Sequence, residues 1–125
     1  MTVAERMQLL RDQFPECTLV AFADLAAEMV LSVNADTARI QEEINGLCAT
    51  ATDALGGASI DAIFANGAES GVFEAVLVER QEIGVFLRST VKQSDAFCCV
   101  CTPRISLGEF LPAARAALDA SDMTP

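Results

Sequence analysis

The residues of this sequence most able to do chemistry are three closely spaced cysteines, Cys98, Cys99 and Cys101. Thiolates can bind zinc or carry redox reactions. They lie in an apolar run, residues 96–101, which predicts a β-strand whose successive side chains point to opposite faces. Cys99 and Cys101 then share one face and Cys98 lies on the other, so the three thiolates do not converge on one metal ion. We expect them to pack as small apolar side chains.

The other two cysteines, Cys17 and Cys48, also lie in apolar runs and have no basic neighbours in the sequence. The total of five is odd, which is unlike a disulfide framework, and the chain has no histidine to complete a zinc site. We therefore expect all five thiols to be reduced and free of metal, with no cofactor bound.

Carboxylate pairs are the remaining candidates for catalysis. Glu42 and Glu43 are neighbours on a predicted helix, and Glu79 and Glu82 flank a predicted turn. Neither pair is expected to converge across a cleft, as catalysis by two carboxyl groups requires. The lack of histidine excludes a Ser-His-Asp triad, and no glycine-rich loop with lysine and serine or threonine is present to hold phosphates. The sequence therefore predicts a protein that is not an enzyme.

Length and composition fit one domain over residues 1–125, because a hydrophobic fraction of 52% can build one sizeable core. The formal net charge is −10, with 18 acidic and 8 basic residues, and such a surface repels nucleic acid. No stretch approaches the roughly 20 apolar residues that span a bilayer, and the N-terminus lacks a basic region followed by an apolar one. We expect a cytoplasmic protein that inserts into no membrane.

Three apolar runs, residues 73–78, 83–87 and 96–101, determine the expected architecture. Their length and their content of Val, Ile, Phe and Cys predict strands, and the polar breaks between them predict an antiparallel meander. None of the runs alternates cleanly between apolar and polar residues, so both faces of the sheet must be covered. The rest of the chain therefore has to provide helices for two sides.

A short helix and a hairpin are predicted first. Residues 2–14 have apolar positions at helical spacing, start with a capping-box pattern at Thr2 and Glu5, and end before a proline. Residues 17–23 and 28–33 predict two strands that pair as a hairpin.

The longest helix is predicted over residues 36–55, with Asp36 as its N-cap and two glycines after its end. Its apolar stripe should be buried against the sheet or against a partner helix. The stripe consists of Ile40, Ile44, Leu47, Cys48, Ala51 and Leu55.

The second half contains one ambiguous segment and a closing helix. Residues 58–71 fit a helical turn or a short strand, and we favour a helical turn in a long connection. The last helix is predicted to start at Ser106, which with Glu109 repeats the capping-box pattern, and to run to about Ala120. Pro112 lacks a backbone N–H group and predicts a kink or a later start.

The resulting order is helix, two strands, helix, three strands, helix, and in this order the chain resembles the roadblock/LC7 family. The resemblance covers essentially the whole chain and rests on apolar patterns in residues 19–24, 29–31, 47–51 and 111–118. It implies an α/β (α+β) fold, a five-stranded antiparallel sheet with helices on both faces. The long helix would cover one face and the two terminal helices the other.

The same resemblance implies a function. Members of the family act as non-catalytic adaptors or regulators, often of Ras-like small GTPases or, in other lineages, of dynein motors. They form homodimers, or heterodimers with a paralogue, in which the long helices pack together and the third strands pair across a two-fold axis. Related profilin-like and PAS-like sheets bind ligands instead, so the alternative is a small-molecule-sensing module that uses residues 58–71.

The predicted meander favours the same contact between chains. Its first strand, residues 73–78, has a sequence neighbour on one side only, so its other edge must be covered or paired. Antiparallel pairing about a two-fold axis would bring Glu74 and Glu79 near their counterparts, so we expect an offset register or pairing with Arg80. The predicted dimer interface comprises Ile44, Leu47, Cys48, Ala51, Glu74, Val76 and Val78.

Overall fold

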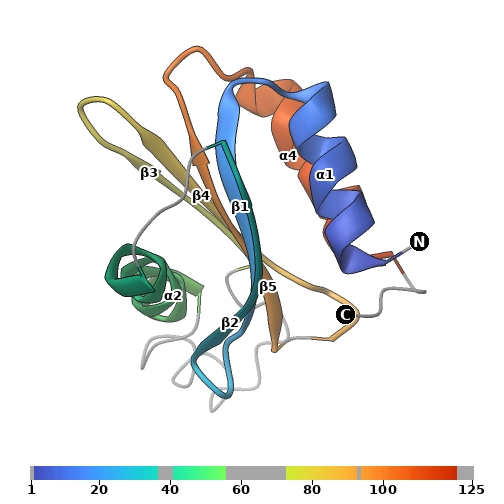
Figure 1. Ribbon diagram of the computed structural model, residues 1–125, viewed down its shortest axis with the longest axis vertical. Coiled ribbons are helices and arrows are strands. Elements are labelled where there is room, and N and C mark those ends of the chain that lie inside the picture. Colours follow the sequence, from blue (N-terminus) through green and yellow to red (C-terminus); the bar gives the residue numbers. More distant parts are fainter. Residues whose placement is uncertain (1, 37–40, 56–72, 93, 121–125) are drawn as a thin grey trace.

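Figure 1 shows the computed structural model, which describes residues 2–36, 41–55, 73–92 and 94–120. Within these residues the elements follow the predicted order: α1 (Val3–Gln13), β1 (Cys17–Asp24), β2 (Met29–Ala35), α2 (Gln41–Leu55), β3 (Glu74–Val78), β4 (Ile83–Arg88), β5 (Asp95–Cys101) and α4 (Leu107–Leu118). The predicted α+β fold is confirmed.

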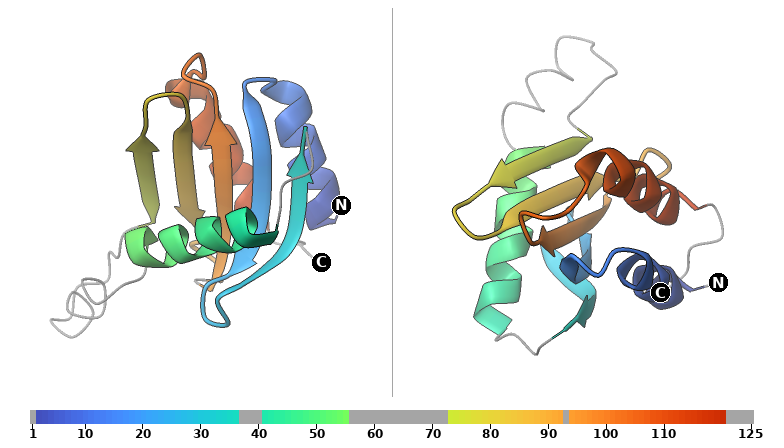
Figure 2. Two further views of the ribbon diagram at one scale, coloured as in Figure 1. Left: turned by 60° about the vertical axis from the view of Figure 1, so that its left-hand side comes forward. Right: turned by 90° about the horizontal axis from the view of Figure 1, so that it is seen from above.

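The five strands form one antiparallel sheet in the order β2-β1-β5-β4-β3. β5 therefore returns to pair with β1, and β2 and β3 form the two edges. α2 lies across the strands on one face, while α1 and α4 lie side by side on the other face (Figures 1 and 2). This is the placement of helices that the resemblance implied.

Both faces of the sheet are buried because the three central strands carry apolar residues at nearly every position. On the α1/α4 face, Phe97 and Phe110 are fully buried, and the ring of Phe110 meets that of Phe14 edge-on at a centroid distance of 5.2 Å. On the α2 face, Phe86 and Leu55 belong to a second core. The prediction that helices must cover two sides is therefore correct.

Local signals set the ends of α1. The Thr2 hydroxyl oxygen accepts a hydrogen bond from the Glu5 N–H at 3.2 Å, so the predicted N-cap is confirmed. At the other end the N–H of Phe14 donates to the Leu10 carbonyl, and the next residue is the proline that prevents further helix.

α4 differs from the prediction. It begins directly after Ser106, but the Ser106 hydroxyl makes no capping hydrogen bond, and the Ser106 carbonyl instead accepts from the N–H groups of Glu109 and Phe110. The helix continues through Pro112 without a delayed start and ends at Leu118, slightly earlier than expected. Burial of its apolar stripe against the sheet offsets the one hydrogen bond that the proline removes.

The N-cap role of Asp36 stays a prediction, because α2 is described from Gln41 on, and residues 37–40, which include the predicted stripe residue Ile40, lie outside the described residues. Asp36 itself extends the sheet: its N–H donates to the Thr18 carbonyl at 3.0 Å, and its carboxylate forms an ion pair with Arg11.

The segment predicted as a helical turn or a ligand loop, residues 58–71, lies outside the described residues. None of the helices in the described part of the chain is both long and apolar enough to cross a membrane.

Candidate functional site

The candidate site lies along the outer edge of β3, and two hydrogen bonds at its ends show how this strand is oriented. The N–H of Arg88 donates to the Phe73 carbonyl at 2.8 Å, and the N–H of Glu79 donates to the Glu82 carbonyl at 2.9 Å. In an antiparallel ladder, the backbone groups of alternate residues point to the same side. The odd-numbered residues of β3 therefore direct their backbone groups toward β4.

The even-numbered residues of β3, Glu74, Val76 and Val78, direct their N–H and C=O groups away from β4. No strand in the described part of the chain pairs with them on that side. The side chain of Val76 packs partly against the α1/α4 core, whereas Val78 is 75% exposed and Leu77, on the α2 face, is 39% exposed. Three of the predicted interface residues thus lie along an unpaired edge with accessible apolar side chains.

Glu74 has a positive partner within its own chain. Its Oε1 lies 3.4 Å from Nη2 of Arg115, which projects from the last turns of α4. Sequence reasoning assigned this role to Arg80 and missed Arg115, because only the packing of α4 beside β3 and β4 brings the two residues together. The charge of Glu74 is therefore partly balanced before any second copy of the chain approaches.

The predicted helix residues of the interface divide into two groups. Cys48 and Ala51 belong to the core on the α2 face, and Ile44 on the same helix is also buried. Leu47 is only half-buried and contacts the edge of that core. Contact between these residues and a second chain remains a prediction, and Leu47 is the member of the group with accessible surface.

A small hollow joins the surface of α2 to the β3–β4 hairpin. Its volume is about 70 Å³, and it is lined by Leu47, Thr50, Leu77, Glu79, Glu82, Gly84, Phe86 and Val100. Pockets that hold drug-sized ligands measure roughly 300–1,000 Å³. The hollow is therefore too small for such a ligand, and it connects the accessible side of α2 with the edge of β3.

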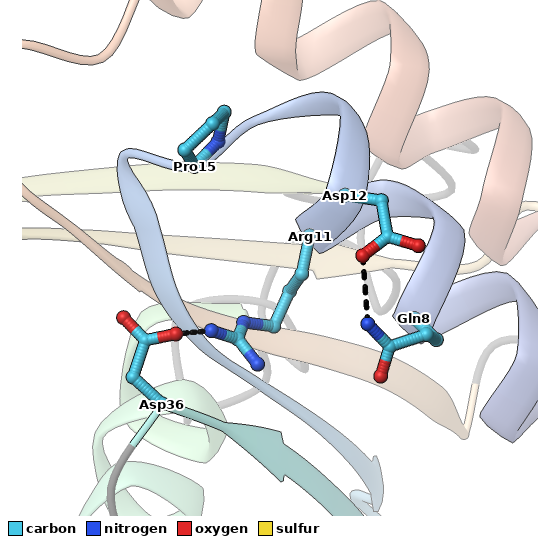
Figure 3. Close-up of a pocket in the computed structure, with 5 residues that line it drawn as sticks. All are labelled: Gln8, Arg11, Asp12, Pro15 and Asp36. Atoms are coloured by element: carbon cyan, nitrogen blue, oxygen red, sulfur yellow. Dashed lines mark hydrogen bonds and ion pairs between the residues drawn. The ribbon is translucent and has the colours of Figure 1, made fainter.

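A second, open hollow of about 530 Å³ lies between α1 and the end of β2 (Figure 3). It is lined by Gln8, Arg11, Asp12, Pro15 and Asp36. Its polar groups already bind one another: the Gln8 amide donates to Asp12 at 2.8 Å, Arg11 pairs with Asp36, and Nη1 of Arg11 donates to Asn34 at 2.6 Å. This network connects α1 to β2, and both of its carboxylates, Asp12 and Asp36, already have partners within it.

The cysteines are arranged as the strand pattern predicted, with one addition. Cys98 lies in the α2-side core, while Cys99 and Cys101 lie in the α1/α4-side core. Cys17 joins the second group, because its position on β1 is directly opposite Cys101 on β5. Sequence reasoning missed this neighbour, since strand alternation gives no information about the register between distant strands.

All five cysteines are buried free thiols, and their surroundings shift their acidity in opposite directions. Hydrogen bonds from Cys101 and Cys99, with a smaller effect of the Arg11 guanidinium, lower the pKa of Cys17. Burial raises the pKa of Cys98 to about 12. In the described part of the chain, no group of His, Cys, Asp or Glu residues is arranged to hold a metal ion.

Solved structures share this architecture. A roadblock/LC7 domain from Streptomyces avermitilis matches with a TM-score of 0.73 at 12% identity, over 91% of this chain and 89% of its own. MglB from Myxococcus xanthus matches with a TM-score of 0.71 at 14% identity, over 92% and 87%. A structure described as MglB with a tetrameric arrangement matches with a TM-score of 0.72 at 13% identity, over 93% and 82%.

No family model matches the sequence, and no curated protein matches it. At 12–14% identity the structural likeness establishes the fold and nothing further. The chain has the roadblock/LC7 fold, as the order of its elements predicted.

Proposed function

We propose that this chain is a non-catalytic regulatory or adaptor protein that acts as a homodimer and binds a Ras-like small GTPase or another NTPase. The observation that carries the proposal is the unpaired edge of β3, whose outward backbone groups are flanked by the exposed Leu77 and Val78. The fold shared with MglB, of which one structure has a tetrameric arrangement, supports self-association. The GTPase partner follows from the roadblock/LC7 resemblance.

The geometry of β3 favours one register for the dimer. Val76 is the central residue of the strand, and its N–H and C=O both point outward, so two copies of Val76 can exchange both hydrogen bonds across a two-fold axis. In this register Glu74 lies opposite Val78 of the second copy rather than opposite a second glutamate. Arg115 also stays in contact with Glu74. The electrostatic repulsion that the sequence suggested is then avoided.

Replacement of Val76 by proline tests the proposed interface. Because the Val76 N–H points away from β4, the substitution removes no hydrogen bond between the described strands and instead removes a donor from the outer edge of β3. Val33→Pro is the matched control on β2, the other edge of the sheet. The N–H of Asp36 donates to Thr18, so by the same alternation the Val33 N–H points away from β1.

Light scattering and sedimentation should show wild-type protein at about twice the chain mass of 13.2 kDa. Val76→Pro should shift it toward one chain mass while circular dichroism stays that of a folded protein, and Val33→Pro should remain dimeric. A wild-type monomer at high micromolar concentration would contradict the homodimer. A folded, dimeric Val76→Pro protein would place the interface elsewhere.

The proposed NTPase partner is tested by comparing the proteins that bind to immobilised wild type and to the immobilised Val76→Pro variant. Both proteins are immobilised and exposed to a lysate of the native cell, and the retained protein is assayed for bound guanine nucleotide and for NTP hydrolysis. We expect a nucleotide-binding protein on the wild type and less of it on the variant. Retained protein without nucleotide would refute the NTPase partner but leave the dimer intact. A rise in melting temperature with a small metabolite would favour the sensing alternative.

A further inference from the structure

Cys17 and Cys101 are direct neighbours across β1 and β5, far apart in sequence but opposite each other in the sheet. The next pair along the ladder is hydrogen-bonded, since the N–H of Thr102 donates to the Glu16 carbonyl at 2.8 Å. In an antiparallel ladder, the pair beside a hydrogen-bonded pair is a non-hydrogen-bonded one, in which the Cα atoms are typically about 4.5 Å apart. This separation lies within the roughly 4.4–6.8 Å that a disulfide spans.

The two side chains also point to the same side of the sheet. Cys17 and Cys101 both belong to the α1/α4-side core, and both are free thiols. Interaction between the two thiols lowers the pKa of Cys17 and raises the pKa of Cys101, so it favours the thiolate of Cys17. Cys17 is therefore the better nucleophile of the pair, and Cys101 is placed to react with it second.

The side chain of Cys17 is fully buried, but its backbone contacts a residue that lines the surface. Arg11 lines the open hollow between α1 and β2 and donates from Nε to the backbone carbonyl of Cys17 at 3.2 Å. In Figure 3 the guanidinium of Arg11 extends from α1 toward Asp36, beside the start of β1. Because Cys17 is packed in the α1/α4-side core, the reaction proposed below requires a local opening of α1 near Arg11 that admits a small oxidant to the thiol.

We propose that Cys17 and Cys101 form a reversible cross-strand disulfide when a hydroperoxide oxidises the chain. The Cys17 thiolate attacks the outer oxygen of the peroxide, the O–O bond breaks, and an alcohol or water leaves with a proton. The resulting sulfenic acid on Cys17 is attacked by the sulfur of Cys101, so the S–S bond forms and the hydroxyl leaves as water. Two thiols lose two electrons and two protons, and the peroxide gains them.

The other cysteines are predicted not to join this reaction. Cys98 lies on the opposite face of the sheet, and burial raises the pKa of both Cys98 and Cys48. Cys99 also interacts with Cys17, but it lies opposite Val20 and is only a diagonal neighbour of Cys17. Diagonal neighbours are typically about 7–8 Å apart, which is farther than a disulfide spans. The proposal is independent of the proposed dimer, because both cysteines belong to one chain.

The experiment is a thiol count and a peptide map of full-length protein. Wild type is treated with hydrogen peroxide, quenched, denatured and titrated, with an untreated sample as reference. We expect the count to fall from five to three, a cross-linked peptide pair that contains Cys17 and Cys101, and full recovery with dithiothreitol. The protein should keep the mobility of one chain on a non-reducing denaturing gel.

Single variants assign the reaction. Cys17→Ser and Cys101→Ser should both abolish the loss of two thiols, whereas Cys98→Ser and Cys99→Ser should retain it. Cys98, Cys99 and Cys101 share one proteolytic peptide, so fragmentation of the cross-linked wild-type peptide identifies the bonded cysteine even if a variant fails to fold. The proposal is overturned if all five thiols stay intact or if the cross-link involves another cysteine. It is equally overturned by a disulfide between two chains, or by oxidation of the cysteines to higher acids without any cross-link.

Discussion

The substitution Arg115→Met tests how the end of α4 is fixed to the sheet. Nη2 of Arg115 donates to the Phe73 carbonyl at 2.8 Å and Nη1 donates to the Arg88 carbonyl, so one guanidinium binds the backbone at the ends of both β3 and β4. Only 20% of the side chain is exposed. Methionine keeps most of the aliphatic packing and removes the charged hydrogen-bond donors.

The size of the effect follows from these contacts. A hydrogen bond from a charged donor contributes roughly 1.5–3 kcal/mol, whereas an exposed ion pair such as that with Glu74 contributes about 1 kcal/mol or less. The Phe73 carbonyl loses less than a full hydrogen bond, because it also accepts from the backbone N–H of Arg88 at 2.8 Å. We therefore expect Arg115→Met to lower the free energy of unfolding by about 2–3 kcal/mol.

Urea titration followed by circular dichroism measures this change. The control is Arg104→Met, because Arg104 is exposed and the described structure gives it no hydrogen bond or ion pair; its effect should stay within about 0.5 kcal/mol. A double-mutant cycle of Arg115→Met with Glu74→Gln separates the energy of the ion pair from that of the hydrogen bonds to the backbone. Equal effects of the two arginine variants would refute the claim that Arg115 holds α4 on the sheet.

Three further perturbations have directions set by the structure. Leu55→Ala, at a fully buried site, should lower the unfolding free energy by about 2–5 kcal/mol in urea titration, and Leu47→Ala by less because Leu47 is half-buried; equal losses would mean that α2 is rotated. Burial raises the pKa of Cys98 from 9.0 to about 12, so the unfolded chain loses this proton first and stability should fall as pH rises from 9.0 toward 12. Cys98→Ala should reduce that slope by up to about 1.4 kcal/mol per pH unit. Thr2→Ala should lower the unfolding free energy by about 1 kcal/mol, whereas Ser106→Ala should have little effect because its hydroxyl makes no capping bond.

The parts of the fold that follow from local pattern were predictable from the sequence. Side chains alternate along a strand, so the separation of Cys98 from Cys99 and Cys101 required only the correct assignment of β5. The two-sided apolar runs likewise required helices on both faces. Helix ends were harder, since Thr2 caps its helix as expected while Ser106, in the same pattern, does not.

The parts that depend on distant contacts were not predictable. The order of strands brings β5 between β1 and β4, and only this order places Cys17 against Cys101. In the same way, Arg115 meets Glu74 because α4 packs beside the ends of β3 and β4. Periodicity along the chain carries no information on register between elements, so the Cys17–Cys101 contact and the Arg115–Glu74 ion pair could be found only in the structure.

The two edges of the sheet differ in a way that bears on the choice of interface. β2 also exposes apolar side chains, Met29, Leu31 and Val33, but its register with β1 shifts between Phe22 and Ala23. Such a bulge breaks the spacing of hydrogen-bonding groups along an edge and is one way in which proteins discourage edge pairing. β3 pairs with β4 without any shift along its whole length, so its outward groups keep regular spacing. A second strand can therefore dock along β3 over several consecutive residues. This difference is why a proline at position 76 should dissociate the proposed dimer while one at position 33 should not.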